Sequence, residues 1–425
     1  MTTKPSYTPA LRFPDFLNDG EWEVKRLGEI CIVNPPSKDI PEEFHYLDLE
    51  SVVAGRIIGC NRIKREGAPS RAQRLVQKYD VLFQMVRPYQ QNNLYFLLED
   101  GQYVASTGYA VLRAKEGVSD SGYLYHIVHS KDFLSQVLQR CTGSNYPAIN
   151  SSSLEDICVP FPPLPEQRRI AQALTALDEL IAATNEKLEQ MKVYKKGLMQ
   201  KLFPAKGKKL PELRFKEFKK DGECEVKKLG DIFSLIRNGA MYNTNNTSGF
   251  PMSRIETISN GVIDYDRVGY SETELKDYRL NEGDILFSHI NSLAHIGKVA
   301  YYDGSKVLYH GMNLLVLRCE KSFYPLYIFY LLNTEEMKIA LRSIAKRAIN
   351  QASISTKELA QLLVYIPQKE EQRKIADCFT SIDEMINQYT NKVSFLEVYK
   401  KGLMQQMFPH VETQNFASLP TDKQM

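Results

Sequence analysis

The sequence contains few of the features that mark disulfide-rich, membrane or exported proteins. Its 425 residues include seven cysteines, none in a Cys-x-x-Cys pair, so reduced thiols in a cytoplasmic protein are expected. No apolar run approaches the roughly 18 residues of a membrane span, and the first residues, MTTKPSYTP, lack the apolar core of a signal peptide. The net charge of +3 permits a nucleic-acid partner without requiring one.

The most informative feature is a segment that the chain contains twice. Residues 166–204 read EQRRIAQALTALDELIAATNEKLEQMKVYKKGLMQKLFP, and residues 371–409 read EQRKIADCFTSIDEMINQYTNKVSFLEVYKKGLMQQMFP. Both copies contain the string VYKKGLMQ, at a constant offset of 205 residues. The duplication extends beyond these segments, because residues 9–30 resemble residues 211–232. The chain is therefore an internal duplication.

Apolar residues in each repeated segment recur at alternating steps of four and three, which is the 3.5-residue period of a coiled-coil seam. The predicted seam consists of Ile170, Leu174, Leu177, Ile181, Leu188, Met191 and Leu198 in the first copy and Ile375, Phe379, Ile382, Ile386, Val393, Leu396 and Leu403 in the second. At 1.5 Å per residue each helix would be about 55 Å long. One helix cannot bury its own seam, so each copy is expected to pack against the other.

The repeats divide the chain into a first globular half (1–160), a first long helix (161–204), a second half (205–366), a second long helix (367–409) and a frayed tail (410–425). Each half is predicted to mix helices and strands. The predicted strands are 80–86, 102–112, 261–270, 284–288, 298–302 and 313–318, and the predicted shorter helices are 123–138 and 326–344. The fold class is thus α+β. Two mixed α/β domains would be joined by two long antiparallel coiled-coil helices in a pseudo-twofold arrangement.

Motifs of catalytic centres are absent or incomplete. There is no GxxxxGK[ST] phosphate loop and no HExxH zinc motif. Asn34–Ser37 (NPPS) resembles the NPP(Y/F/W) motif of adenine methyltransferases, but serine replaces the aromatic residue that would stack on a flipped base. Pro14-Asp15 with Glu23–Lys25 resembles a PD…ExK nuclease site, but the duplicate has Lys216-Glu217 in place of Pro-Asp. The sequence therefore predicts neither a catalytic residue nor a metal ligand.

Polar loops in both halves indicate a binding chemistry, because Arg pairs with guanine and Asn or Gln with adenine in the major groove of DNA. The candidates of the first half are Ser70, Arg71, Arg87, Tyr89, Gln90, Gln91, Asn92, Asn93, Asn145 and Tyr146. Those of the second half are Asn243, Asn245, His289, Asn291, Ser292, His295, Asn313, Asn350 and Gln351, with Lys346 and Arg347 as phosphate contacts.

Two variable halves that alternate with two repeated helices resemble the specificity subunit of type I restriction-modification enzymes. The segments that carry the resemblance are PFPPLPEQR (160–168), IPQKEEQR (366–373), KKGLMQ (195–200 and 400–405), YDVLF (79–83) with GDILF (283–287), and RFPDF with RFKEF. The second helix lead has Gln368–Glu370 where the family often has further prolines.

The resemblance implies a subunit without catalytic activity. Each half would be a target-recognition domain that reads one part of a split double-stranded DNA sequence, and the helices would set the unread spacer. The helices would also dock two modification subunits and, through them, the restriction (motor-nuclease) subunits. S-adenosylmethionine, ATP and Mg²⁺ would belong to those partners and not to this chain.

Two other classes stay open at this level. A self-contained DNA methyltransferase-nuclease is opposed by the missing cofactor loop, and a coiled-coil adaptor that does not bind DNA is opposed by the polar, aromatic-containing loops.

Overall fold

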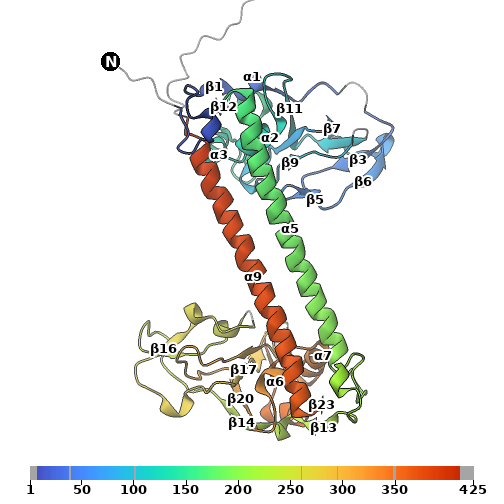
Figure 1. Cartoon of the computed structure of the whole chain (residues 1–425), viewed down its shortest axis with the longest axis vertical. Helices are drawn as coiled ribbons and strands as arrows, with labels where there is room; N and C mark the ends of the chain where they lie inside the picture. Colours follow the sequence, from blue (N-terminus) through green and yellow to red (C-terminus); the bar gives the residue numbers. More distant parts are fainter. Residues whose placement is uncertain are drawn as a thin grey trace, which may run out of the picture. The chain divides into compact units, whose positions relative to one another are not determined.

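The structure is a computed structural model that describes residues 7–37, 40–99, 102–259, 261–293, 295–347 and 351–411. It contains two compact units (Figure 1). Unit 1 comprises Met1–Asn185 and Asn391–Met425, and unit 2 comprises Glu186–Thr390. Each unit is therefore built on one half of each long helix, whereas the sequence repeats divide the chain into consecutive segments. None of the helices described is long and apolar enough to cross a membrane.

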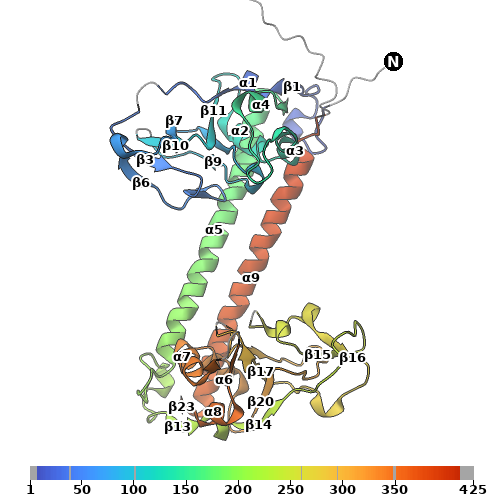
Figure 2. The same ribbon diagram turned by 180° about the vertical axis from the view of Figure 1, so that it is seen from behind.

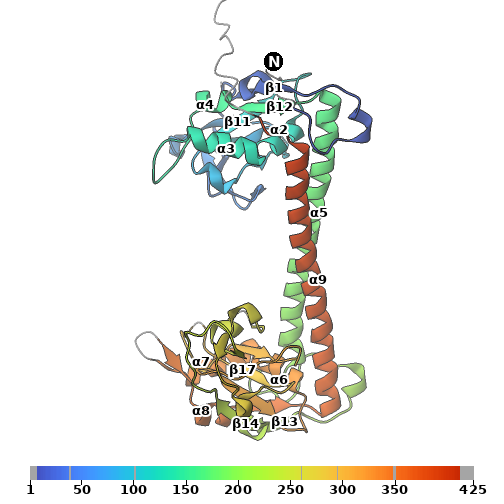
Figure 3. The same cartoon turned by 90° about the vertical axis from the view of Figure 1, so that its left-hand side faces the viewer.

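Unit 1 contains two four-stranded sheets, with strand orders β2-β11-β8-β9 and β6-β3-β10-β7. Its strands are β1 (Glu23–Arg26), β2 (Cys31–Val33), β3 (Glu43–Leu47), β4 (Val52–Val53), β5 (Arg56–Ile57), β6 (Asn61–Lys64), β7 (Ala72–Val76), β8 (Val81–Gln84), β9 (Leu94–Tyr95), β10 (Tyr103–Ser106), β11 (Tyr109–Ala114) and β12 (Cys158–Phe161). Its short helices are α1 (Leu27–Ile30), α2 (Ser121–Ile127), α3 (Lys131–Arg140) and α4 (Ser151–Glu155). Figure 3 shows α2 and α3 beside the end of α9 (Lys369–Met407).

Unit 2 contains one four-stranded sheet, β14-β20-β17-β19, whose order matches that of β2-β11-β8-β9. Figure 2 labels β14, β17 and β20 of this sheet. Its strands are β13 (Glu225–Lys228), β14 (Phe233–Asn238), β15 (Phe250–Met252), β16 (Gly269–Ser271), β17 (Ile285–Phe287), β18 (Ile290–Asn291), β19 (Val299–Tyr301), β20 (Leu315–Cys319), β21 (Lys346–Arg347), β22 (Ala352–Ser353) and β23 (Leu363–Ile366). Its short helices are α6 (Pro325–Leu332), α7 (Glu335–Ile344) and α8 (Thr356–Gln361). The predicted α+β class is confirmed.

The two long helices are α5 (Leu164–Leu202) and α9, each of 39 residues. All fourteen predicted seam residues are buried or half-buried. In unit 1, Asp178 of α5 forms an ion pair with Lys400 of α9, and in unit 2, Lys195 pairs with Asp383. The residue numbers of the two pairs have the same total, so the same antiparallel register describes the helix pairing in each unit.

The repeated sequence motifs hold each unit to its helices. Glu166, at the start of α5, accepts two hydrogen bonds from the guanidinium of Arg12, with N–O distances of 2.7 and 2.8 Å. Glu371, at the start of α9, is bonded in the same way by Arg214. All four side chains are at least nine-tenths buried. The Glu-Gln-Arg motif is thus in part a structural anchor.

The aspartate of each DVLF or DILF motif forms a second repeated ion pair. Asp80 accepts from the Nε and Nη2 atoms of Arg113 at 2.8 and 2.7 Å, and Asp284 accepts from Arg318 at 2.7 Å twice. Both aspartates are almost fully buried. Each ion pair therefore ties the start of one strand, β8 or β17, to the neighbouring strand of the same sheet, β11 or β20.

Four predictions of secondary structure are corrected. The strand predicted at 102–112 is divided into β10 and β11, which lie in different sheets. The helix predicted at 123–138 is divided between α2 and α3, where the Ser130 hydroxyl accepts from the Phe133 N–H and begins a new helix. The helix predicted at 326–344 is likewise divided, because Thr334 caps α7. Most of the strand predicted at 261–270 is not a strand, since the Asp264 carboxylate accepts from the Asp266 N–H and stabilises a 3₁₀ turn.

The predicted tail is also corrected where it is described. Val411 is buried in the core of unit 1, and His410 contacts the Asp132 carboxylate. Residues 412–425 lie outside the described residues.

Candidate nucleic-acid interface

In unit 1 the polar loop that follows β8 is joined to the segment that precedes α4. Val86 forms an antiparallel bridge with Ala148, and the Arg87 N–H donates to the Pro147 carbonyl at 2.7 Å. The Arg87 guanidinium lies over the ring of Tyr146, 4.3 Å from the ring centre. Candidates that are far apart in sequence therefore form one surface.

The backbone of this loop is strained at two of the candidate residues. Arg87 and Gln91 have φ angles of 54° and 52°, a left-handed region that non-glycine residues rarely adopt. They flank the 3₁₀ turn Pro88–Gln90. Such conformations cost on the order of 1 kcal/mol each and persist where the surroundings enforce them.

Gln84, which the sequence analysis did not single out, enforces this conformation. Its side-chain Nε2 donates to the Val86 carbonyl and to Gln90 Oε1, both at 2.8 Å. Its Oε1 accepts from the Asn92 N–H at 3.1 Å. Because Gln84 is the last residue of a strand with four buried side chains, no sequence pattern distinguished it from a core residue.

Asn93 has a structural role and is removed from the DNA-binding candidates. It is 1% exposed, its Oδ1 accepts from the Gln84 N–H at 2.8 Å, and its Nδ2 lies 3.3 Å from Nε2 of His129. The Asn93 amide nitrogen can only donate, so Nε2 of His129 accepts from it. Nδ1 of His129 then donates to the Tyr125 carbonyl at 2.7 Å. The imidazole is therefore neutral, in agreement with the burial that lowers its pKa.

This buried neutral histidine predicts a loss of stability in mild acid. Burial lowers the pKa values of His126, His129 and His310, the last to about 4. Because each folded pKa lies below the unfolded value of 6.5, folding is most favourable above pH 6.5 and weakens as the pH falls toward the folded values. The loss approaches about 1.4 kcal/mol per histidine per pH unit.

The measurement is the urea midpoint at pH 7.5 and at pH 5, a range above the titration of most carboxylates. We expect a lower midpoint at pH 5 and a smaller pH effect in His129→Gln, which cannot be protonated. An equal urea midpoint at both pH values would contradict the assignment of buried, neutral histidines to the folded protein.

The other candidates of unit 1 are accessible. Ser70, Arg71, Tyr89, Gln90, Asn145 and Tyr146 are exposed, and Arg87, Gln91 and Asn92 are half-buried. The turn between β10 and β11 connects the segment of Ser70 and Arg71 to the polar loop that follows β8. The Arg71 carbonyl accepts from the Thr107 N–H, and the Gly108 carbonyl accepts from the Met85 N–H.

In unit 2 the loop after β17 is paired in the same manner. Ile290 and Asn291 form β18, which pairs with β22, and β22 pairs with β21. This small sheet places Asn291 in the same sheet as the exposed Lys346 and Arg347, next to Gln351. Asn350 lies outside the described residues. The Lys346 ammonium lies 3.2 Å from the Glu358 carboxylate.

Further candidates of unit 2 gather at one end of its main sheet. Phe287 and Asn238 both lie opposite Leu315 in register, so the loops 238–249 and 288–297 leave the sheet beside Asn313. A Cβ atom on Gly239 would lie 1.8 Å from the Gly311 carbonyl oxygen, so the first of these loops is pressed against the start of β20 and requires glycine. The exposed candidates here are Asn243, Asn245, Ser292, His295, Asn313 and Gln351.

His289 is not accessible and is removed from the candidates. It is buried, and burial lowers its pKa. Its carbonyl accepts from the Ile354 N–H. Asn291 is half-buried, and its amide is partly used by Ser288 and Ser292.

The loop pairings of the two units correspond residue by residue. The bridge between Val86 and Ala148 in unit 1 matches the pair Ile290 and Ser353 in unit 2. Arg87 and Tyr146 then correspond to Asn291 and Gln351. The two units thus carry different hydrogen-bonding side chains on the same platform of paired loops, with a left-handed backbone at Arg87 and a strand at Asn291.

Comparison with known proteins agrees with this duplication. The family model described as the type I restriction modification DNA specificity domain matches residues 19–193 and again residues 221–394. The chain belongs to this family. The matched segments cover residues 19–160 of the first predicted half and 221–366 of the second, so each unit contains most of one DNA specificity domain.

Relatives in Methanocaldococcus jannaschii resemble different lengths of the chain. The putative type I restriction enzyme MjaX specificity subunit is 44% identical over 44% of this chain and 45% of its own length. The chain thus spans less than half of that relative. The MjaVIII specificity subunit is 27% identical over 93% of this chain and 92% of its own length.

Two solved structures share the fold. The type I restriction-modification specificity subunit of M. genitalium superposes with a TM-score of 0.59 at 16% identity, over 95% of this chain and all of that one. A chain from a type I restriction-modification complex superposes with a TM-score of 0.56 at 24% identity, over 92% and 98%. Specificity subunits leave catalysis to other subunits, so this chain is a non-catalytic subunit.

Proposed function

We propose that each unit reads one part of a split double-stranded DNA target and that α5 and α9 set the unread gap between the parts. The helices would also dock two modification subunits and, through them, the restriction subunits. Catalysis would take place on those partners, which would hold S-adenosylmethionine, ATP and Mg²⁺. The complex would act on DNA in the cytoplasm.

The observation that carries the proposal is the shared platform with different side chains. Arg87 with Tyr146 in unit 1, and Asn291 with Gln351 in unit 2, occupy corresponding positions on the paired loops. Arginine favours guanine and the amides favour adenine. Two readers with the same loop pairing and different polar groups are suited to two different short sequences.

The side chains around these positions support a DNA-facing surface. Tyr146 is 65% exposed, and the Arg87 guanidinium lies over its ring. In unit 2, Lys346 and Arg347 are exposed on β21, across β22 from Asn291, where they could contact phosphates and position the unit.

The test is a matched pair of substitutions, Arg87→Ala and Asn291→Ala. Methylated sites are mapped by single-molecule sequencing in cells that carry the chain and its modification subunit. Arg87→Ala should relax one position of one part of the target, and Asn291→Ala one position of the other part. Each lost base contact corresponds to about 1–3 kcal/mol of discrimination.

Arg62→Lys, which keeps the charge of an exposed arginine that is not a candidate for DNA contact, serves as a control for general effects on charge and folding. Two variants that relax the same part of the target, or neither part, would contradict split reading by the two units.

A further inference from the structure

The backbone of unit 1 fixes the orientation of one buried side-chain amide. The Nε2 atom of Gln84 donates to the Val86 carbonyl at 2.8 Å, and its Oε1 atom accepts from the Asn92 N–H at 3.1 Å. A backbone carbonyl can only accept, and a backbone N–H can only donate. The two ends of the Gln84 amide therefore cannot be exchanged. Gln84 is 2% exposed, so it acts from inside the unit.

Gln84 in turn fixes the amide of Gln90. The Nε2 atom of Gln84 also donates to Oε1 of Gln90, at 2.8 Å. The oxygen of Gln90 is thus held toward the interior, and the NH2 group is the other end of the same amide. Gln90 is exposed, and its NH2 group forms no hydrogen bond within the residues that the structure describes. What Gln90 offers to a partner is therefore a pair of donors.

Asn92 has the same polarity. Its Oδ1 atom accepts from the Ala54 N–H at 3.2 Å, and a backbone N–H can bind only the oxygen of an amide. The NH2 group of Asn92 has no bond among the described side and main chains. Arg87, in the same loop, carries donors only, and its guanidinium lies over the ring of Tyr146. Three side chains of one loop thus offer donors, while both amide oxygens are already bonded.

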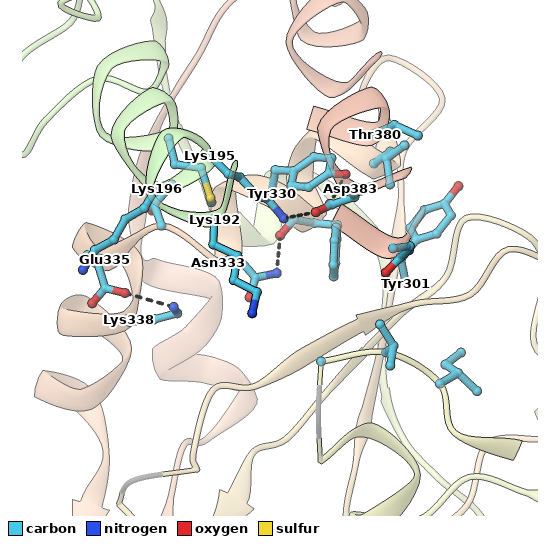
Figure 4. Close-up of a pocket in the computed structure, with 18 of the residues that line it drawn as sticks. Lys192, Lys195, Lys196, Tyr301, Tyr330, Asn333, Glu335, Lys338, Thr380 and Asp383 are labelled. Carbon is cyan, nitrogen blue, oxygen red and sulfur yellow. Dashed lines mark hydrogen bonds and ion pairs between the residues drawn. The ribbon is translucent and has the colours of Figure 1, made fainter. Parts of the chain in front are cut away.

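Polar side chains that serve only the fold are paired differently. Figure 4 shows a cluster of unit 2 in which the Asp383 carboxylate accepts from the Lys195 ammonium at 2.5 Å and from the Tyr330 hydroxyl at 2.8 Å. In that cluster donors and acceptors satisfy one another. In the loop of unit 1 the amide acceptors are satisfied and the donors are not, which suits a partner that is rich in acceptors.

The bases of DNA differ in what they offer to such a loop. In the major groove guanine presents two acceptors, O6 and N7, whereas adenine presents one acceptor beside one donor. The bidentate pairing of Asn or Gln with adenine needs the amide oxygen as well as the nitrogen. Because both oxygens are engaged inside the unit, Gln90 and Asn92 cannot pair with adenine in this way.

We propose that the loop of residues 87–92 reads guanine through the donors of Arg87, Gln90 and Asn92, and that the buried Gln84 is the positioning residue that gives Gln90 its polarity. This inference rests on the proposed function and names the base that this loop of unit 1 selects. Residue type alone would predict adenine for the two amides, so the hydrogen bonds inside the unit change the base that they read.

The test replaces Gln90 by glutamate in the full chain. One carboxylate oxygen of Gln90→Glu can still accept from Gln84, and the other then faces outward as an acceptor. A carboxylate favours cytosine, whose N4 amine donates. Methylated sites are mapped by single-molecule sequencing in cells that carry the modification subunit of the same system, and Arg87→Ala identifies the part of the target that unit 1 reads.

We expect guanine at one position of that part with the natural chain, and cytosine at the same position with Gln90→Glu. Methylation of the natural target by Gln90→Glu should fall at least about tenfold, as for the loss of one base contact. Gln77→Glu is the matched control. It adds the same charge at an exposed residue that precedes β8, whereas the loop follows β8, so its target should be that of the natural chain.

A second variant, Gln84→Met, tests the positioning role. Methionine fills a similar space without holding the Gln90 amide, so this amide can turn and present either end. We expect both guanine and adenine at the position that Gln90→Glu changes. A lower melting temperature together with the natural base preference would show that Gln84 serves only the fold, and would overturn its positioning role.

The possible failures are distinguishable. An unchanged target in Gln90→Glu, or a change at a position where the natural chain selects a base other than guanine, would overturn the inference and leave the proposed function intact. Methylation that does not depend on the chain would overturn the proposed function and the inference with it.

Discussion

Glu166→Ala lowers the free energy of unfolding of unit 1 by about 3–5 kcal/mol, the expected cost of breaking a buried ion pair by removing one partner. The Arg12 guanidinium, 4% exposed, would remain buried without its counter-charge. A guanidinium keeps its proton in proteins, so the arginine cannot relieve the loss by becoming neutral. The Nε1–H of Trp22, 3.1 Å from Glu166 Oε2, would also lose its acceptor.

Trp22 makes this prediction directly measurable. It is the only tryptophan of the sequence and lies in contact with the altered group, so its fluorescence during urea unfolding reports on unit 1. The control is Glu179→Ala, at an exposed position of the same helix, where a change within about 0.5 kcal/mol is expected. An unchanged midpoint in Glu166→Ala would mean that the ion pair does not anchor the unit.

The long helices could be predicted from the sequence because their signal is local and repeated. Ile170, Leu174 and their duplicates obey the heptad over the whole segment, and Pro204 and Pro409 mark its ends. The partner of each seam followed from the duplication, since a helix that exposes an apolar stripe must bury it against another surface.

The helix breaks at Ser130 and Thr334 were missed for a different reason. Both lie within continuous helical periodicity, and a hydroxyl in such a position can point to solvent or cap a new helix. Only packing against the sheet decides which of these occurs.

The binding surface could be predicted only in outline. Polar residues on loops after buried strands were recognisable, but Asn92 and Asn93 have the same type of side chain and only Asn93 is buried. What separates them is the hydrogen bonding of Gln84 and His129, residues that are close only in the fold. The same is true of His289. Its side chain was predicted to be accessible for DNA binding, and it is buried.

Lengthening both helices by one heptad should lengthen the gap in the DNA target. The insertions are seven residues after Asn185 and seven after Thr390, the two points at which the chain passes between units. Seven residues preserve the phase of the seam, and equal insertions preserve the antiparallel register on both sides. At 1.5 Å per residue the helices grow by about 10 Å, which corresponds to about three base pairs at 3.4 Å each.

The control insertion places the same number of residues after Gly207, in the exposed segment that follows α5. This change lengthens the connection without lengthening the seam, so the gap should stay as it is in the natural chain. Any general disturbance caused by added residues would affect both variants.

The decisive measurement is single-molecule sequencing of methylated DNA from cells that carry the modification subunit with either the natural chain or the chain with one heptad added to each long helix. We predict a two-part target for both chains, with the same bases in each part and a gap longer by about three base pairs for the lengthened chain. A gap that does not change, or an uninterrupted target for the natural chain, would contradict the proposal that two reading units are spaced by their helices.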